Sequence, residues 1–284
     1  MPFPTLYHWD LPQALQDEGG WANRDIAERF AEYAFAVVDR LGDRVKRWLI
    51  FNEPWVFTFA GYLGGRHAPG IRDAAMTMRA THIVNLAQGL AARAMRATNR
   101  IEGLGTAFSM SGVYPASASA DDKAAAERRF AFSNLWFLEP ALHGRYPDAY
   151  VRGAKAIERL GIEPGDMAIA RCDFDFIGIN LYSRSVVAFD PQDANLGARD
   201  VPPREIERTD FGWEVCPEAI HDVIMRIWRD YGKPVYITEN GCSYGDGPDE
   251  QGVVNDERRV RFLQRYIGQV GRAIEEGADV RGYY

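Results

Sequence analysis

The fold is decided by the stretch Lys46-Arg47-Trp48-Leu49-Ile50-Phe51-Asn52-Glu53-Pro54. Its apolar part, from Trp48 to Phe51, is continuous, as in a strand that is buried on both faces of a parallel sheet. Proline cannot donate a backbone hydrogen bond, so Pro54 marks the point at which this strand stops pairing. We therefore expect Asn52 and Glu53 at the carboxyl end of a buried strand, where barrels and doubly wound sheets place their chemistry. The alternative at this stage is a strand-end glutamate that is simply solvated.

Strand-like and helix-like segments alternate along the rest of the chain. The last expected helix carries an apolar stripe that we expect to be buried, formed by Val260, Leu263, Ile267, Val270 and Ile274. Alternation of this kind predicts parallel strands with right-handed crossovers, in one α/β domain that spans residues 1–284. From the pattern alone, a (β/α) barrel and an open doubly wound sheet both remain possible. The expected strands are 5–10, 48–51, 105–113, 174–182, 234–241 and the opening of 279–284, and the expected helices are 26–41, with Asn23 as N-cap, 78–100, 123–143, 217–231 and 256–277.

Composition and charge exclude several classes of protein. The chain has 284 residues, of which 46% are hydrophobic and 26% charged, and its net charge is -7. Without a basic block, neither nucleic acid nor an anionic membrane is an expected partner. No segment approaches the roughly 18 apolar residues of a membrane span. The three scattered cysteines and the absence of a signal-peptide pattern at the N-terminus predict a cytoplasmic protein.

Two glutamates occupy equivalent positions at the ends of predicted strands. Glu53 and Glu239 each follow an apolar run, lie next to an asparagine, and are followed by a strand breaker, Pro54 or Gly241. Two carboxylates at one mouth of a sheet suit glycoside cleavage, in which one protonates the leaving oxygen and the other attacks the anomeric carbon or activates water. A metal site built from these glutamates with His8 and His67 lacks the ligand spacing of zinc sites, so we expect neither a metal nor a cofactor.

Aromatic and amide side chains also gather at predicted strand ends. A sugar site needs aromatic faces together with imidazole or amide partners for hydroxyl groups, and the residues His8, Trp9, Trp55, Asn180 and Tyr182 supply these groups. Taken singly, each of them has an ordinary alternative as a core or surface side chain.

Together these residues resemble glycoside hydrolase family 1, the β-glucosidase family. The resemblance implies a (β/α)8 TIM barrel and a retaining mechanism with a covalent glycosyl-enzyme. The stretches that carry it occur in the order of the family and span nearly the whole chain, namely 5–12 (TLYHWDLP), 52–55 (NEPW), 67–70 (HAPG), 175–182 (DFIGINLY) and 237–241 (ITENG).

The resemblance also implies roles for single residues. Glu53 corresponds to the acid/base and Glu239 to the nucleophile. Asn52 matches the residue that bonds the sugar 2-hydroxyl, and Trp55 matches a platform for the aglycone. The remaining matches line the position of the cleaved sugar, namely His8, Trp9, Asn180 and Tyr182, the tyrosine lying against the nucleophile. Leu181 stands where the family usually has a tyrosine.

Set against the family, the chain corresponds to strands three to seven plus the start of strand eight. On this comparison we expect a partial barrel, truncated at both ends, that is weakly active or inactive as it stands. Exposed barrel edges would favour self-association. The expected substrates are β-glucosides or short β-linked oligosaccharides with a terminal β-D-glucosyl residue.

Three other functions remain open on the sequence. A 6-phospho-β-glucosidase of the same family would read its phosphate in a segment that this sequence does not include. An endo-glycanase also places Asn-Glu-Pro and a second glutamate at strand ends, but the stretches 6–10 and 237–241 favour the exo-acting family. A non-catalytic sugar-binding or assembly fragment is the third, and the presence of both Glu53 and Glu239 argues against it.

Overall fold

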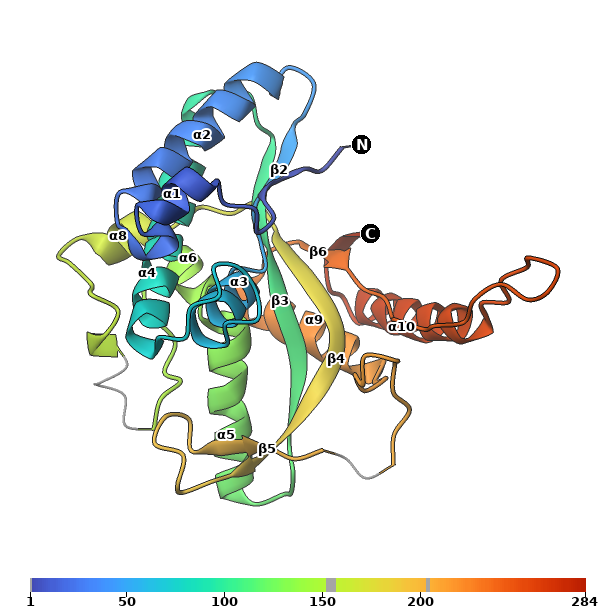
Figure 1. Cartoon of the computed structure of the whole chain (residues 1–284). Coiled ribbons are helices and arrows are strands. Elements are labelled where there is room, and N and C mark those ends of the chain that lie inside the picture. The colour runs from blue at the N-terminus through green and yellow to red at the C-terminus, as the bar shows by residue number, and fades with distance from the viewer. Residues whose placement is uncertain (1, 152–156, 203–204) are drawn as a thin grey trace. The chain divides into compact units, whose positions relative to one another are not determined.

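The computed structural model describes residues 2–151, 157–202 and 205–284 (Figure 1). The chain forms two compact units. Unit 1 comprises Met1–Ser109 and Ala131–Gly178, and unit 2 comprises Met110–Phe130 and Ile179–Tyr284. No helix of the described residues is long and apolar enough to cross a membrane.

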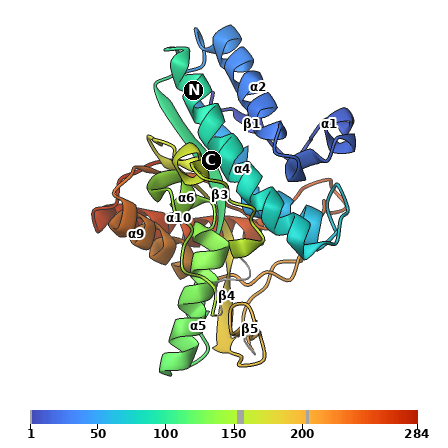
Figure 2. The same cartoon turned by 90° about the vertical axis from the view of Figure 1, so that its left-hand side faces the viewer.

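The sheet of unit 1 is parallel, as the alternating pattern predicts. Strand β1 (Thr5–Tyr7) pairs with β2 (Arg47–Asn52), which in turn pairs with β3 (Gly103–Pro115), whose first part lies in this unit. Helix α2 (Ile26–Leu41) makes the crossover from β1 to β2 and packs along α4 (Ala74–Ala97), as Figure 2 shows. The described residues of unit 1 also form α1 (Gln13–Asp17), the 3-10 turn η1 (Gly20–Ala22), α3 (Pro54–Thr58), the π-turns η2 (Phe59–Leu63) and η3 (Ala131–Leu135), α6 (Leu138–His143) and α8 (Asp166–Ala170).

An aromatic cluster forms the core beneath the end of β2. Phe51 of β2 stacks on Phe30 of α2 with ring centroids 4.7 Å apart, and Tyr7, Trp21 and Phe57 pack around this pair. The indole Nε1 of Trp21 donates to the hydroxyl of Tyr7 at 3.1 Å, so the buried polar atoms of the cluster are paired. The cluster fixes the strand immediately before Asn52 and Glu53.

Unit 2 continues β3 and contains β4 (Ile177–Phe189), apart from its first two residues. The strand order is β3-β4-β6-β7, with the short strand β5 (Ala198–Asp200) antiparallel to β4. Strand β6 (Val235–Glu239) runs parallel to β7 (Val280–Tyr283). The helices are α5 (Ala120–Phe130), α9 (Glu218–Tyr231) and α10 (Glu257–Glu275), of which α9 and α10 pack together.

The predicted burial of α10 is wrong in part. Val260, Ile267 and Ile274 are each about half exposed at 48–51%, although Val270 is buried. The buried face instead contains Phe262 and Tyr266, whose rings stack 4.1 Å apart, together with Val270 and Ala273. Both stripes repeat at helical spacing, and the larger aromatic surface is the one that packs against the core.

Two helix boundaries also differ from the sequence prediction. Asp25, not Asn23, precedes the first turn of α2, and the Asn23 side chain accepts from the backbone N–H of Asp25 at 3.1 Å. The single helix expected over 123–143 is divided into α5, η3 and α6. The other expected strands and helices are present, with ends shifted by a few residues.

Candidate active-site residues

Glu53 lies at an abrupt turn from strand to helix in unit 1. Strand β2 ends at Asn52, helix α3 begins at Pro54, and Glu53 between them adopts a left-handed backbone with φ 48° and ψ 63°. A register shift between β2 and β3 just before this point re-aims the end of the strand. The backbone N–H of Glu53 still donates to the carbonyl of Ala107 at 2.8 Å, and the residue is only 7% exposed. The solvated strand-end alternative is therefore wrong for Glu53.

His8, Trp9 and Asn52 meet beside this turn. The indole Nε1 of Trp9 donates to the backbone carbonyl of Asn52 at 2.9 Å. The side-chain amide of Asn52 donates to Nε2 of His8 at 3.1 Å, which places the ring proton of His8 on Nδ1. Trp9 also has a left-handed backbone, with φ 79°. These contacts bring together the end of β2 and the segment that follows β1.

Trp55 is the fifth predicted site residue in unit 1. It lies in the first turn of α3, stacks on Phe59 at 4.6 Å, and meets the edge of Phe132 at 6.2 Å. Its indole Nε1 is buried, and no described residue accepts a hydrogen bond from it. As a residue, Trp55 is half-buried.

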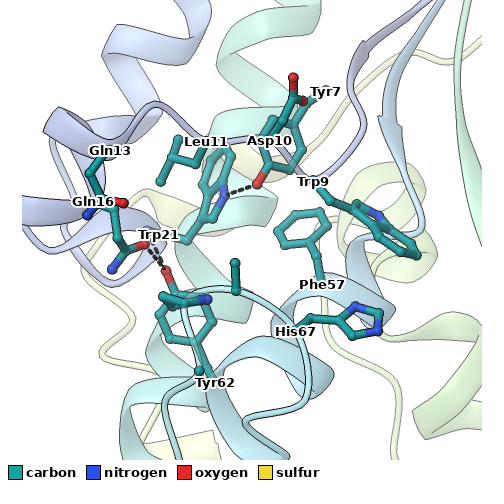
Figure 3. A pocket seen from close by; sticks show the side chains of 13 residues that line it. Tyr7, Trp9, Asp10, Leu11, Gln13, Gln16, Trp21, Phe57, Tyr62 and His67 are labelled. Atoms are coloured by element: carbon teal, nitrogen blue, oxygen red, sulfur yellow. Dashed lines mark hydrogen bonds between the residues drawn. The ribbon is translucent and has the colours of Figure 1, made fainter.

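Trp9 also lines a cavity of about 470 Å³ (Figure 3). His67 lies beside the tryptophan on the same side of the cavity, with ring centroids 5.2 Å apart, and belongs to the stretch 67–70 that carries the family resemblance. Gln16 accepts from the hydroxyl of Tyr62 at 3.3 Å on the far wall, and Asp10 and Gln13 add further polar groups. Sequence reasoning did not single out the last four residues as a group.

Glu239 is the last residue of β6 in unit 2. The hydroxyl of Tyr182, on the neighbouring strand β4, donates to Oε2 of Glu239. Trp213 packs against Tyr182 with ring centroids 5.3 Å apart, and the carbonyl of Tyr182 accepts from the buried Tyr266 at 3.2 Å. The tyrosine that holds the carboxylate is thus itself held on two sides.

Asn180 is the remaining predicted residue, and it also points at β6. Its Oδ1 accepts from the hydroxyl of Thr238 at 2.6 Å, and Asn180 is 1% exposed. The structure therefore brings Asn180, Tyr182 and Glu239 together, and it adds Thr238 and Trp213. Thr238 could have been found from its place in the run 237–241, whereas Trp213 lies in an irregular segment without a local signal.

No group of three or more His, Cys, Asp or Glu side chains in the described part of the chain is arranged to hold a metal ion. The polar groups at the strand ends are instead carboxylates, amides, an imidazole and a phenol, beside indole rings. Such groups can bond hydroxyl groups and stack on flat sugar faces, and each unit contributes one carboxylate, Glu53 in unit 1 and Glu239 in unit 2.

The protein family follows from comparison with known sequences. A family model described as glycosyl hydrolase family 1 matches residues 1–284. The chain belongs to this family. The resemblance drawn from the motifs is thereby confirmed.

Curated relatives of the family share about two fifths of their residues with this chain. Beta-glucosidase A of Acetivibrio thermocellus is 39% identical over 290 residues, covering 100% of this chain and 64% of the relative. Beta-glucosidase A of Thermotoga maritima is 40% identical over 285 residues, covering 100% and 63%. The chain thus spans slightly less than two thirds of the length of these relatives.

The family 1 b-glucosidase from Thermotoga maritima also has a solved structure that matches this fold. The two superpose with a TM-score of 0.93 at 40% identity, over 99% of this chain and 63% of the other. The fold is therefore α/β and corresponds to part of the family's TIM barrel, which confirms the predicted fold class.

Proposed function

We propose that this chain carries the two carboxylates of a retaining β-glucosidase. Glu239 is the nucleophile, Glu53 is the acid/base, and the substrate is a terminal β-D-glucosyl residue on a β-glucoside or a short β-linked oligosaccharide. The observation that carries the proposal is a family match over residues 1–284 in a chain whose Glu53 directly follows the parallel strand β2 and whose Glu239 ends the parallel strand β6. Relatives named beta-glucosidase support the choice of sugar.

The surroundings of Glu239 suit a nucleophile. A nucleophilic carboxylate must present one oxygen to the anomeric carbon while the other is held. The Tyr182 hydroxyl holds Oε2, which leaves Oε1 as the attacking atom. In the first step this oxygen bonds to the anomeric carbon, the bond to the leaving oxygen breaks, and the protonated Glu53 gives its proton to that oxygen.

The second step regenerates both carboxyl groups. Water attacks the anomeric carbon, Glu53 accepts a proton from it, and the bond to Glu239 breaks, releasing glucose with retained configuration. A retaining mechanism of this kind uses carboxyl groups about 5–5.5 Å apart.

The neighbouring side chains have complementary roles. Asn52 is held by His8 and by the indole of Trp9, and we assign these three to the sugar hydroxyls. Trp55 is the platform for the aglycone. The solved Thermotoga maritima relative in complex with isofagomine lactam or deoxynojirimycin supports a site of this class for a glucoside-like ring. We also propose the cytoplasm as the compartment, on the basis of three unpaired cysteines.

The test is covalent labelling of the 284-residue chain with 2,4-dinitrophenyl 2-deoxy-2-fluoro-β-D-glucoside. The fluorine lowers the rates of both steps, and the good leaving group restores the rate of the first step. The glycosyl-enzyme therefore accumulates even if the chain reacts slowly. We expect one added sugar by intact mass and its location on Glu239 by peptide mass spectrometry. A label on another residue would contradict the assignment of the nucleophile.

Two further arms separate the alternatives. A 6-phosphorylated version of the reagent should label more slowly, and faster labelling would identify a 6-phospho-β-glucosidase. If neither reagent labels the chain but glucose or cellobiose binds by calorimetry, the non-catalytic sugar-binding function is the correct one.

A further inference from the structure

Glu239 is flanked on both sides by residues whose side chains are tied to neighbouring strands. Before it, the hydroxyl of Thr238 donates to Oδ1 of Asn180 on β4 at 2.6 Å. After it, the amide of Asn240 donates to the backbone carbonyl of Leu181, also on β4, at 2.6 Å. The carboxylate therefore lies between two anchors that are separate from its own bond to Tyr182.

The second anchor continues to β7. Oδ1 of Asn240 accepts from the hydroxyl of Tyr283 at 2.7 Å. Because β4 and β7 are the two neighbours of β6 in the sheet of unit 2, Asn240 connects the strands on both sides of Glu239. The Asn240 side chain thus bridges β4 and β7 immediately after the last residue of β6.

The donor and the acceptor in each hydrogen bond of this connection are defined. Asn240 uses its NH2 group toward Leu181, so its oxygen must face Tyr283 and can only accept. Burial raises the pKa of Tyr283, which keeps the phenol protonated and able to donate. The Asn240 amide therefore has one orientation in this connection, and the Tyr283 hydroxyl acts in it as the donor.

The anchors act where the strand ladder stops. The last pair in the register of β6 with β7 is Ile237 with Tyr283, and β6 ends two residues later, at Glu239. The segment that follows is irregular up to α10. The end of a strand that leads into an irregular segment is prone to fraying, and a carboxylate placed there needs support from side chains.

We infer that Tyr283, acting through Asn240, and Thr238, acting through Asn180, are positioning residues that hold Glu239 in line for attack on the anomeric carbon. The inference rests on the proposed role of Glu239 as the nucleophile. Neither Tyr283 nor Thr238 needs to touch the substrate, because each acts through a neighbour of the carboxylate.

The first test compares Tyr283→Phe with Tyr284→Phe, which removes the same atom from the next residue of the chain. The measured quantities are the maximum rate of labelling by the 2-fluoro glucoside, the concentration that gives half this rate, and the melting temperature. We expect Tyr283→Phe to lower the maximum rate by about 10- to 100-fold, because small misplacements of a reacting group have effects of that size. The half-saturating concentration and the melting temperature of Tyr283→Phe should change little, and Tyr284→Phe should lose much less of the maximum rate than Tyr283→Phe.

The second test compares two substitutions of Thr238, one that removes its hydroxyl group and one that keeps it. Thr238→Val keeps the shape but removes the donor to Asn180, whereas Thr238→Ser keeps the hydroxyl. We expect the valine variant to be labelled at least about fivefold more slowly and the serine variant to recover most of the rate. Equal rates in both variants, or a fall in rate that only parallels a fall in melting temperature, would overturn the positioning role.

Crystal structures of the unmodified chain and of Tyr283→Phe decide the inference even if no label forms. In that case the proposed nucleophile role fails, while the anchor is still tested by where the Glu239 carboxylate lies. We expect Asn240 to turn away from Leu181 and the bond between Glu239 and Tyr182 to be lost or lengthened in the variant. Unchanged positions of Asn240 and Glu239 would show that Tyr283 positions neither.

Discussion

At the scale of one residue, Glu53 combines a constrained backbone with a proposed chemical role. A non-glycine residue in the left-handed region costs about 1–2 kcal/mol. Here that conformation allows Asn52 to finish a parallel strand and Pro54 to begin a helix within three residues. Strain of this kind persists where the surroundings enforce it, and in Glu53 the backbone bond to Ala107 and the packing of Pro54 do so.

The prediction at this scale concerns Glu53→Gln, which keeps the shape of the side chain but removes its proton. General acid assistance is worth about 10²- to 10⁴-fold, so hydrolysis of alkyl β-glucosides and cellobiose should fall by that amount. A 2,4-dinitrophenyl leaving group needs no proton, and its release in the first step should change far less. The measurement is kcat/KM across a series of leaving groups. The exposed Glu32→Gln serves as control, and an equal loss on all substrates would exclude the acid role.

At the scale of elements, unit 1 depends on a very close approach of α4 to α8. Gly89, in the middle of α4, has the backbone carbonyl of Ile169 only 1.8 Å from the place where a Cβ would be. Both helices must therefore pass each other backbone to backbone, and Arg93 on the next turn adds a bond to the same carbonyl at 2.5 Å. No helix propensity can account for a glycine at this point, because alanine is favoured there by about 1 kcal/mol.

We predict opposite effects for two Gly→Ala changes in helices. Gly89→Ala should destabilise the protein by about 2 kcal/mol or more, because α8 must move to make room. Gly268→Ala in α10, where a Cβ would meet nothing within 4 Å, should stabilise it by about 0.5–1 kcal/mol. Urea unfolding of both variants measures the difference. A neutral Gly89→Ala would mean that α8 does not pack this closely on α4.

The same elements show what the sequence can predict. The runs that end at Glu53 and Glu239 were predicted correctly, because an unbroken apolar run followed by a strand breaker has few other interpretations. The buried face of α10 was predicted wrongly, because Val260, Ile267 and Ile274 repeat as regularly as Phe262 and Tyr266. Only the packing of α9 against α10 determines which of the two faces is buried. Contacts such as Trp213 with Tyr182 join segments with no local pattern, and these required the structure.

At the scale of the whole molecule, unit 1 is held by a buried ionic network that joins distant parts of the chain. Asp166 and His82 are each 1% exposed, and Nε2 of His82 bonds Oδ2 of Asp166 at 2.8 Å. Arg24, from the segment before α2, pairs with the same carboxylate, and the hydroxyl of Tyr146 bonds Nδ1 of His82 at 2.9 Å. Contacts across 142, 84 and 64 residues of sequence thus converge on one carboxylate and one imidazole.

The pKa directions in this network make its stability sensitive to acid. Burial lowers the pKa of His82, despite the opposing effect of Asp166. Burial alone would raise the pKa of Asp166, but hydrogen bonds from Arg24, the backbone of Glu163 and His82 lower it overall. An unfolded histidine gains its proton near pH 6.5 and an unfolded aspartate near pH 3.9, before the folded groups do. Stability should therefore fall first below about pH 6.5 and again below about pH 4.

The prediction for the whole molecule is that His82→Gln flattens the first part of this pH dependence. The unmodified chain should lose melting temperature between pH 7.5 and pH 5.5, because the unfolded state takes up a proton that folded His82 does not. The glutamine variant should have a lower melting temperature at pH 7.5, because part of the network is missing. Its melting temperature should, however, fall by less than that of the unmodified chain between pH 7.5 and pH 5.5. His143→Gln, the control, should change the slope less than His82→Gln does. Calorimetric scans at five pH values measure the slopes, and equal slopes for the unmodified chain and His82→Gln would exclude the network as the source of acid sensitivity in this range.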